Sequence, residues 1–152
     1  MIHTNFIERA VALNFLDNDD LWQRSKVDGA MRHDLRSVFN NNNFFVASFV
    51  GYKLVGVTAV FVRQVWPAVI LEVHTYVEPR HKKIADKILS QHVSFLKHEV
   101  LGDELVTSTS SKNMACHNFL IKRLGFKVEE VKEGLLTDEG KPLTVYDLRL
   151  KL

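Results

Sequence analysis

The chain has 152 residues, of which 46% are hydrophobic and 25% are charged, as is typical of one soluble globular domain. Its 20 basic and 18 acidic side chains leave a formal net charge of +2, too balanced for a dedicated nucleic-acid-binding protein. One cysteine, Cys116, excludes an internal disulfide and favours a reducing compartment. No secretory signal and no apolar run of roughly 20 residues is present, so we expect one cytoplasmic domain over residues 1–152 with no membrane or nucleic-acid partner.

The N-terminal third is helical in character. Apolar residues recur at helical spacing from Phe6 to Leu13 and predict a first helix. Further helices are expected around residues 21–22, after acidic residues that can cap a helix, and over 30–39. Four asparagines at 40–43 then predict a turn, because asparagine tolerates left-handed backbone conformations.

From Phe44 the hydrophobic period changes and predicts strands. Two apolar runs, 44–50 and 54–62, are joined by a short loop that contains Gly51, a pattern typical of a β-hairpin. Both runs are apolar on both faces, which indicates strands covered on both sides. A third strand is expected over 68–77, with Pro67 at its start because proline has no amide hydrogen to donate.

The second half of the chain predicts an alternation of helices and strands around the same sheet. The expected elements are an amphipathic helix over 82–100, a strand over 105–110, a helix over 113–124 ended by Gly125, and a closing hairpin of strands 126–131 and 143–152 around residues 137–140. The sum is a mixed α/β (α+β) layer built on one sheet.

This order of elements resembles the GNAT superfamily of acetyltransferases, and two local sequences support the resemblance. The stretch 76–85, Tyr-Val-Glu-Pro-Arg-His-Lys-Lys-Ile-Ala, is similar to the family's acetyl-CoA loop, in which a strand-ending valine and a proline precede Arg-x-x-Gly-x-Gly/Ala. The stretch 111–126 is similar to the family segment that runs from an asparagine to Gly-Phe. The resemblance covers roughly residues 44–150. It implies one GNAT-like domain with a central, mostly antiparallel, twisted sheet and helices on both faces.

The resemblance also implies an activity, the transfer of acetyl from acetyl-CoA to a small-molecule or protein amine. Amide hydrogens and the positive end of the dipole at a helix N-terminus attract phosphate, which suits the pyrophosphate of coenzyme A. By position, the cofactor-binding residues would be Val77, Arg80, His81, Lys82, Lys83, Ile84, Ala85 and Asn113. Lys83 stands where the family has a glycine, and the alternative for the basic residues is a solvated turn.

The third strand carries the candidate catalytic residues. Glu72, His74 and Tyr76 share one of its faces because side chains alternate along a strand. A carboxylate or an imidazole there can remove a proton from an amine, and the family's usual glutamate corresponds by position to Glu72. The alternative is that Glu72 and His74 are structural polar groups. The family's tyrosine acid corresponds to Ile121, so the leaving group would be protonated by Tyr76, a serine of 108–111, or water.

For four further residues, a purely structural role competes with a functional one. Asn113 either contacts the pantetheine arm or caps its helix. Cys116 is expected to be a buried thiol, and His92 a hydrogen-bonded core histidine. The seven histidines, His117 among them, show no metal-ligand spacing, so no metal is expected.

Two rival functions share the predicted fold. Degenerate acetyltransferase-like domains occur among proteins of tailed phages, and the eroded loop resembles those, which implies a catalytically inactive structural protein of phage particle or head assembly. The second rival is a sensor that binds acyl-CoA without turnover, which would keep the ligand of the transferase but not its reaction. Either a homo-oligomer or a large assembly would then be the partner.

Overall fold

The computed structural model describes residues 1–17 and 44–152 except 138, so the helices expected around 21–22 and over 30–39, and the asparagine turn at 40–43, lie outside the described residues. The described elements are β1 (Ile2–Ile7), α1 (Arg9–Leu16), β2 (Phe44–Val50), β3 (Lys53–Gln64), β4 (Ile70–Val77), the 3-10 helix η1 (Pro79–Ile84), α4 (Ala85–His98), β5 (Glu104–Ser110), α5 (Met114–Lys122), β6 (Lys127–Leu136) and β7 (Pro142–Lys151).

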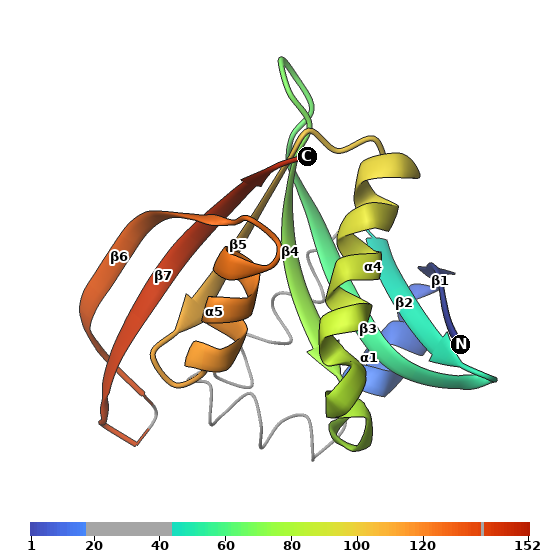
Figure 1. Cartoon of the computed structure of the whole chain (residues 1–152), viewed down its shortest axis with the longest axis horizontal. Helices are drawn as coiled ribbons and strands as arrows, with labels where there is room; N and C mark the ends of the chain where they lie inside the picture. The colour runs from blue at the N-terminus through green and yellow to red at the C-terminus, as the bar shows by residue number, and fades with distance from the viewer. Residues whose placement is uncertain (18–43, 138) are drawn as a thin grey trace.

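The strands form one seven-stranded sheet in the order β1-β2-β3-β4-β5-β7-β6 (Figure 1). Every neighbouring pair is antiparallel except β4 and β5, which run parallel. A parallel pair needs a crossover connection, and η1 and α4 supply it. The expected mostly antiparallel mixed sheet is confirmed.

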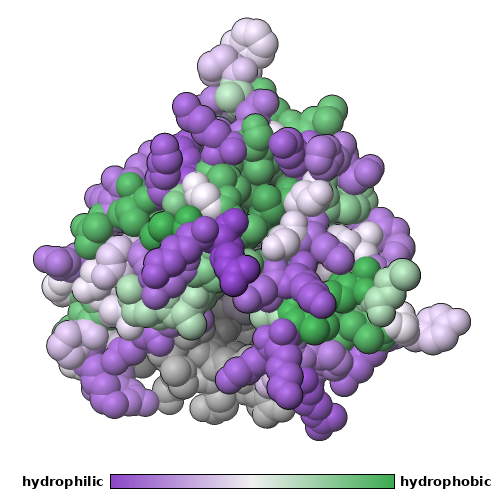
Figure 2. Space-filling model, viewed as in Figure 1, coloured by the Kyte–Doolittle hydropathy of each residue, from purple (hydrophilic) through white to green (hydrophobic). Residues whose placement is uncertain are grey.

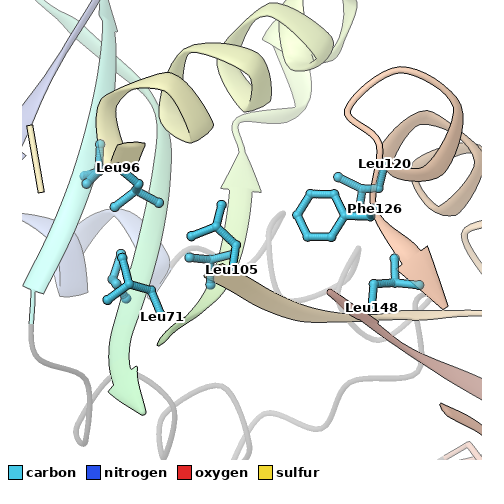
Figure 3. Packing of buried hydrophobic residues seen from close by; sticks show 9 residues of the cluster. Leu71, Leu96, Leu105, Leu120, Phe126 and Leu148 are labelled. Atoms are coloured by element: carbon cyan, nitrogen blue, oxygen red, sulfur yellow. The ribbon is translucent and has the colours of Figure 1, made fainter. Parts of the chain in front are cut away.

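Helices cover both faces of the sheet, as expected. In Figure 1, α4 and α5 lie in front of the sheet and α1 lies behind it. The cluster on the α4 and α5 face includes Leu71, Leu96, Leu105, Leu120 and Phe126, which converge in Figure 3. The cluster on the α1 face consists of Ala12, Leu16, Phe45, Ala47, Val57 and Ala59. Strands β2 and β3 contribute to both clusters, which explains their continuous apolar runs.

The first strand is the main correction to the sequence-based elements. The helix expected from Phe6 begins only at Arg9, and Phe6 itself lies in β1, opposite Val46 of β2. Its ring contacts Phe44 and Phe95 edge-to-face, with centroids 5.8 and 4.9 Å away. Pairing with β2, whose partner residues lie 38 to 48 positions away, therefore overrides the local helical spacing.

The remaining differences concern element ends. The helix expected over 82–100 is η1 followed by α4, and the third strand begins at Ile70 because Trp66 and Pro67, joined by a cis peptide bond, lie in the preceding loop. The glycine that ends α5 is confirmed, since Gly125 has φ +84°. The last hairpin is longer than expected, and β6 is exposed along its whole length. Figure 2 shows the α4 and α5 face as a mixture of hydrophilic and hydrophobic residues.

In the described part of the chain, no helix combines the length and the apolarity of a membrane span.

Candidate active site

The two parallel strands at the centre of the sheet diverge. β4 and β5 pair over only three positions, from Ile70 opposite Glu104 to Glu72 opposite Val106. One further contact follows, in which Thr107 Oγ1 donates to the Val73 carbonyl over 2.7 Å. β4 nevertheless stays paired with β3 as far as Val77. The two strands fan apart toward the lower edge of the sheet in Figure 1.

Beyond the divergence, one edge of β4 is not paired with β5. The hydrogen-bond pattern shows which residues direct their main-chain groups toward that edge. Glu78 N–H donates to the Val55 carbonyl over 2.7 Å, so the even-numbered residues of β4 direct their main-chain groups toward β3. The odd-numbered residues direct theirs toward β5, as the Val73 carbonyl does. Thr75 and Val77 therefore present backbone amide and carbonyl groups to the divergence. Val77 was among the expected cofactor-binding residues.

The structure brings Glu72 and His74 together at the start of this divergence. His74 Nε2 lies 3.1 Å from Glu72 Oε2, and the Arg63 guanidinium of β3 binds the other oxygen, with Nε 3.0 Å from Oε1. These partners lower the Glu72 pKa to about 2, the hydrogen bond from His74 being the largest cause, although burial acts in the opposite direction. Glu72 is therefore an ionised acceptor, and a weak base.

This pairing assigns different roles to the two ring nitrogens of His74. A carboxylate only accepts hydrogen bonds, so Nε2 carries the proton that bonds Glu72. In the neutral ring, Nδ1 then has the free lone pair. The side chain of His74 is 24% exposed, so an acceptor molecule can reach it. The sequence placed both residues on one face, but it gave no sign of Arg63, whose register position beside Glu72 depends on the β3–β4 bulge.

Tyr76 lies further along the same face of β4. It packs against the apolar cluster under α1, together with Leu54 and Phe49. Of the three expected catalytic residues, Glu72 and His74 are therefore joined by a hydrogen bond, and Tyr76 lies beside them on the same strand.

The basic loop after β4 contains a counter-charge that the sequence analysis missed. The Glu78 carboxylate binds His81 Nδ1, and it lies 3.8 Å from Lys53 Nζ and 3.9 Å from Arg80 Nε. The pKa of Glu78 is lowered: burial would raise it, but the hydrogen bond from His81 and the charge of Lys53 outweigh burial. Glu78 lies inside the loop motif of residues 76–85, so the sequence itself contained a signal for this counter-charge.

The loop backbone is also partly engaged. The His81 amide donates to the Glu78 carbonyl over 2.8 Å, and the Ala85 amide donates to the Lys82 carbonyl, as i to i+3 bonding in a 3-10 helix requires. Arg80, Lys82 and Lys83 are exposed, whereas Ile84 and Ala85 are half-buried. The groups of this loop that are available to an anion are therefore mainly the basic side chains, and to a lesser extent the main-chain amides.

Comparisons with known proteins agree on the architecture. No family model matches this sequence, and no curated protein matches it. Solved structures do match, among them a GNAT-family acetyltransferase from Streptococcus pneumoniae, at 15% identity over 100% of both chains with a TM-score of 0.70. Another is YncA of Salmonella typhimurium, a putative acetyltransferase solved with its cofactor acetyl-CoA, at 16% identity over 100% of this chain and 94% of that one with a TM-score of 0.72. A third is a ribosomal-protein-alanine N-acetyltransferase from Brucella melitensis, at 13% identity over 99% of both chains with a TM-score of 0.69. The chain has the GNAT acetyltransferase fold.

Within the GNAT fold, α5 positions several residues that the sequence singled out. Asn113 caps α5, its Oδ1 accepting from the Cys116 amide over 3.1 Å. Cys116 was expected to be buried but is only half-buried, at the margin of the apolar cluster, and Ile121 is half-buried there as well. His117 is buried and bonds Thr109, with Nδ1 2.7 Å from Oγ1.

His92 is a hydrogen-bonded core histidine, as expected. It is 2% exposed, and both ring nitrogens have hydroxyl partners. Among residues 1–17 and 44–152 except 138, no three histidine, cysteine, aspartate or glutamate side chains gather as a metal site would require.

Proposed function

We propose that this chain is an N-acyltransferase that transfers an acetyl group from acetyl-CoA to an amine of a small molecule or a protein. The observation that carries the proposal is the diverging edge of β4, where Thr75 and Val77 lie beyond the three positions that pair with β5 and close to the Glu72–His74 pair. YncA, which shares this fold, was solved with acetyl-CoA.

The described residues fit such a co-substrate at two places. The backbone groups of Thr75 and Val77 suit the amide-containing pantetheine arm, which can add to a strand edge as an extra partner does. The exposed cations Arg80, Lys82 and Lys83 suit the phosphates. Glu78 opposes them, so we expect modest affinity. When bound, acetyl-CoA supplies a thioester whose carbonyl carbon an amine can attack.

In the proposed reaction, His74 Nδ1 takes the proton from the attacking amine. Glu72 holds the ring in the required tautomer through Nε2, and it stabilises the imidazolium that forms, as a carboxylate behind a catalytic imidazole does. Arg63 keeps Glu72 ionised. The Val77 amide orients the carbonyl that is attacked. A positioned base of this kind contributes about 10²- to 10⁴-fold to a rate.

The proton for the leaving group has no dedicated donor at the family position. Ile121 packs into the apolar cluster and cannot donate, so Tyr76, a serine of 108–111 or water would have to do so. This observation favours a second candidate, a protein that binds acyl-CoA, or has only an architectural role, without turnover.

Calorimetry with acetyl-CoA tests the proposal first. We expect saturable binding below millimolar concentration, together with a rise in melting temperature, because a ligand selective for the folded state stabilises it. Absence of binding at millimolar acetyl-CoA rejects both transfer and sensing. Co-purification with a large assembly would then support the architectural role.

Transfer to a panel of amines tests the residue assignment. We expect His74→Ala to bind acetyl-CoA as the wild type does and to lose about 10²- to 10⁴-fold in turnover. His98→Ala is the matched control, because His98 is an exposed histidine at the end of α4. Binding without turnover in the wild type would support the sensor instead.

A further inference from the structure

A continuous line of hydrogen bonds runs through the protein beneath α4. It links four strands to the helix: Thr75 Oγ1 to Thr58 Oγ1 (2.6 Å), Thr58 Oγ1 to His92 Nδ1 (2.6 Å), His92 Nε2 to Ser48 Oγ (2.7 Å), Ser48 Oγ to Thr4 Oγ1 (3.3 Å) and Thr4 Oγ1 to Gln91 Oε1 (2.9 Å). We call these six residues the threonine–histidine chain. Its middle is the most deeply enclosed part, since Ser48, Thr58 and His92 are at most 2% exposed.

The hydrogen bonds of the chain run in one direction, which is deduced from the acceptor at its surface end. Gln91 Oε1 only accepts, so the hydroxyl proton of Thr4 is used there, and Thr4 must accept from Ser48. Ser48 has then used its own proton and must accept from His92 Nε2. His92 is therefore the Nε2–H tautomer, and its Nδ1 accepts from Thr58.

The same assignment of donors and acceptors extends to Thr75 of β4. Thr58 has donated its proton to His92 Nδ1, so its oxygen accepts from the Thr75 hydroxyl. The hydroxyls of Thr4, Ser48 and Thr58 thus each donate once and accept once, and the Thr75 hydroxyl donates to Thr58. The direction of the Thr75 hydroxyl bond is consequently linked, through Thr58, to a histidine on another element.

Thr75 connects the threonine–histidine chain to the part of β4 that carries the candidate site. It lies opposite Thr58 in the β3–β4 register, on the α4 face, while its main chain faces the divergence from β5. It stands between His74 and Val77. A shift of β4 at this point would move both the base and the backbone edge that the proposed function assigns to acetyl-CoA.

Packing alone does not require such a chain. Valine has nearly the shape of threonine, and an apolar pair at positions 58 and 75 would fill the same space without polar groups that need partners. In the described residues every buried side-chain nitrogen or oxygen has a hydrogen-bond partner, so the chain is complete. A complete buried network makes one arrangement of the strands preferred over others.

We propose that His92 is a positioning residue that acts through Thr58 on Thr75, and so holds the diverging edge of β4 in the geometry that binds the acyl carrier. The inference rests on the proposed function for the identity of that ligand. The direction of the chain and its effect on β4 do not depend on it.

The tautomer of His92 tests the direction in the whole protein. Nitrogen-15 chemical shifts of the ring at neutral pH distinguish Nε2–H from Nδ1–H, and we expect Nε2–H for His92. The Nδ1–H tautomer, or a mixture of the two, would overturn the proposed direction and with it the link from His92 to Thr75.

Two matched valine variants test the positioning role. Thr58→Val removes the hydroxyl between His92 and Thr75, and Thr4→Val removes a hydroxyl at the opposite end of the chain. We expect Thr58→Val to weaken acetyl-CoA binding about tenfold or more, as loss of one aligned contact can do, and Thr4→Val to change it less than about twofold. Equal effects of the two variants, or none from Thr58→Val, would overturn the positioning role.

A second readout separates this inference from the proposed function. Amide hydrogen exchange at His74 and Tyr76 reports how firmly β4 is held on β3, whether or not acetyl-CoA binds. We expect faster exchange at both amides in Thr58→Val than in Thr4→Val at matched global stability. If the wild type does not bind acetyl-CoA, the proposed function fails while this difference still supports the role of the chain; equal exchange in the two variants overturns that role.

Discussion

Acidification should destabilise this protein through His92. Burial beneath α4 lowers the His92 pKa from 6.5 to about 4, because the enclosed site disfavours the charged ring. Between these values the unfolded chain binds a proton that the folded protein resists, so stability falls as pH falls from 6.5 to 4 and is fully present above 6.5. The two pKa values imply that this residue costs the folded state about 3 kcal/mol at pH 4.

Urea unfolding at pH 7 and pH 4 measures this loss when the wild type is compared with His92→Gln. Glutamine does not titrate, and the other ionisable groups are common to both proteins, so the difference between their pH dependences isolates His92. The variant should be less stable at pH 7 and should lose less on acidification. If both proteins lose the same free energy, or if NMR titration places the His92 pKa near 6.5, the reasoning from burial is wrong.

Four other outcomes follow from the structure. Gly56→Ala should cost about 1–3 kcal/mol in urea unfolding, because the new Cβ would lie 3.0 Å from Ile88 Cγ2 on α4. Gly125→Ala should cost about 1 kcal/mol, since its φ of +84° is unfavourable for alanine. Leu105→Ala, at a fully buried side chain, should cost about 2–5 kcal/mol. Glu72→Gln should flatten the loss of stability between pH 4.5 and 2, because the lowered Glu72 pKa stabilises the folded state only above that range.

Much of the fold was predictable because its signals are local. The hairpin of β2 and β3, the amphipathic α4 and the glycine after α5 follow from hydrophobic period and turn chemistry, which act over a few residues. β1 was not predictable in this way, since its strand conformation depends on partner residues 38 to 48 positions away. The order β5-β7-β6 likewise depends on pairing between distant segments.

The candidate site divides along the same line. Period-two alternation placed Glu72 and His74 on one face, and the helix after them explained the basic loop. Arg63 and Lys53 were missed because each meets its carboxylate only across the β3–β4 register or the folded loop. The length of the β4–β5 pairing, which opens the site, has no local signature at all.

The sequence by itself determined the elements of the second half, the face of β4 that carries Glu72 and His74, and the burial of His92, because each depends on spacing within one segment. Only the tertiary structure decided where β4 leaves β5, which charges neutralise the loop, and which hydroxyls His92 meets. Those are contacts between segments far apart along the chain. Their geometry is set when the whole sheet packs against the hydrophobic clusters on its two faces.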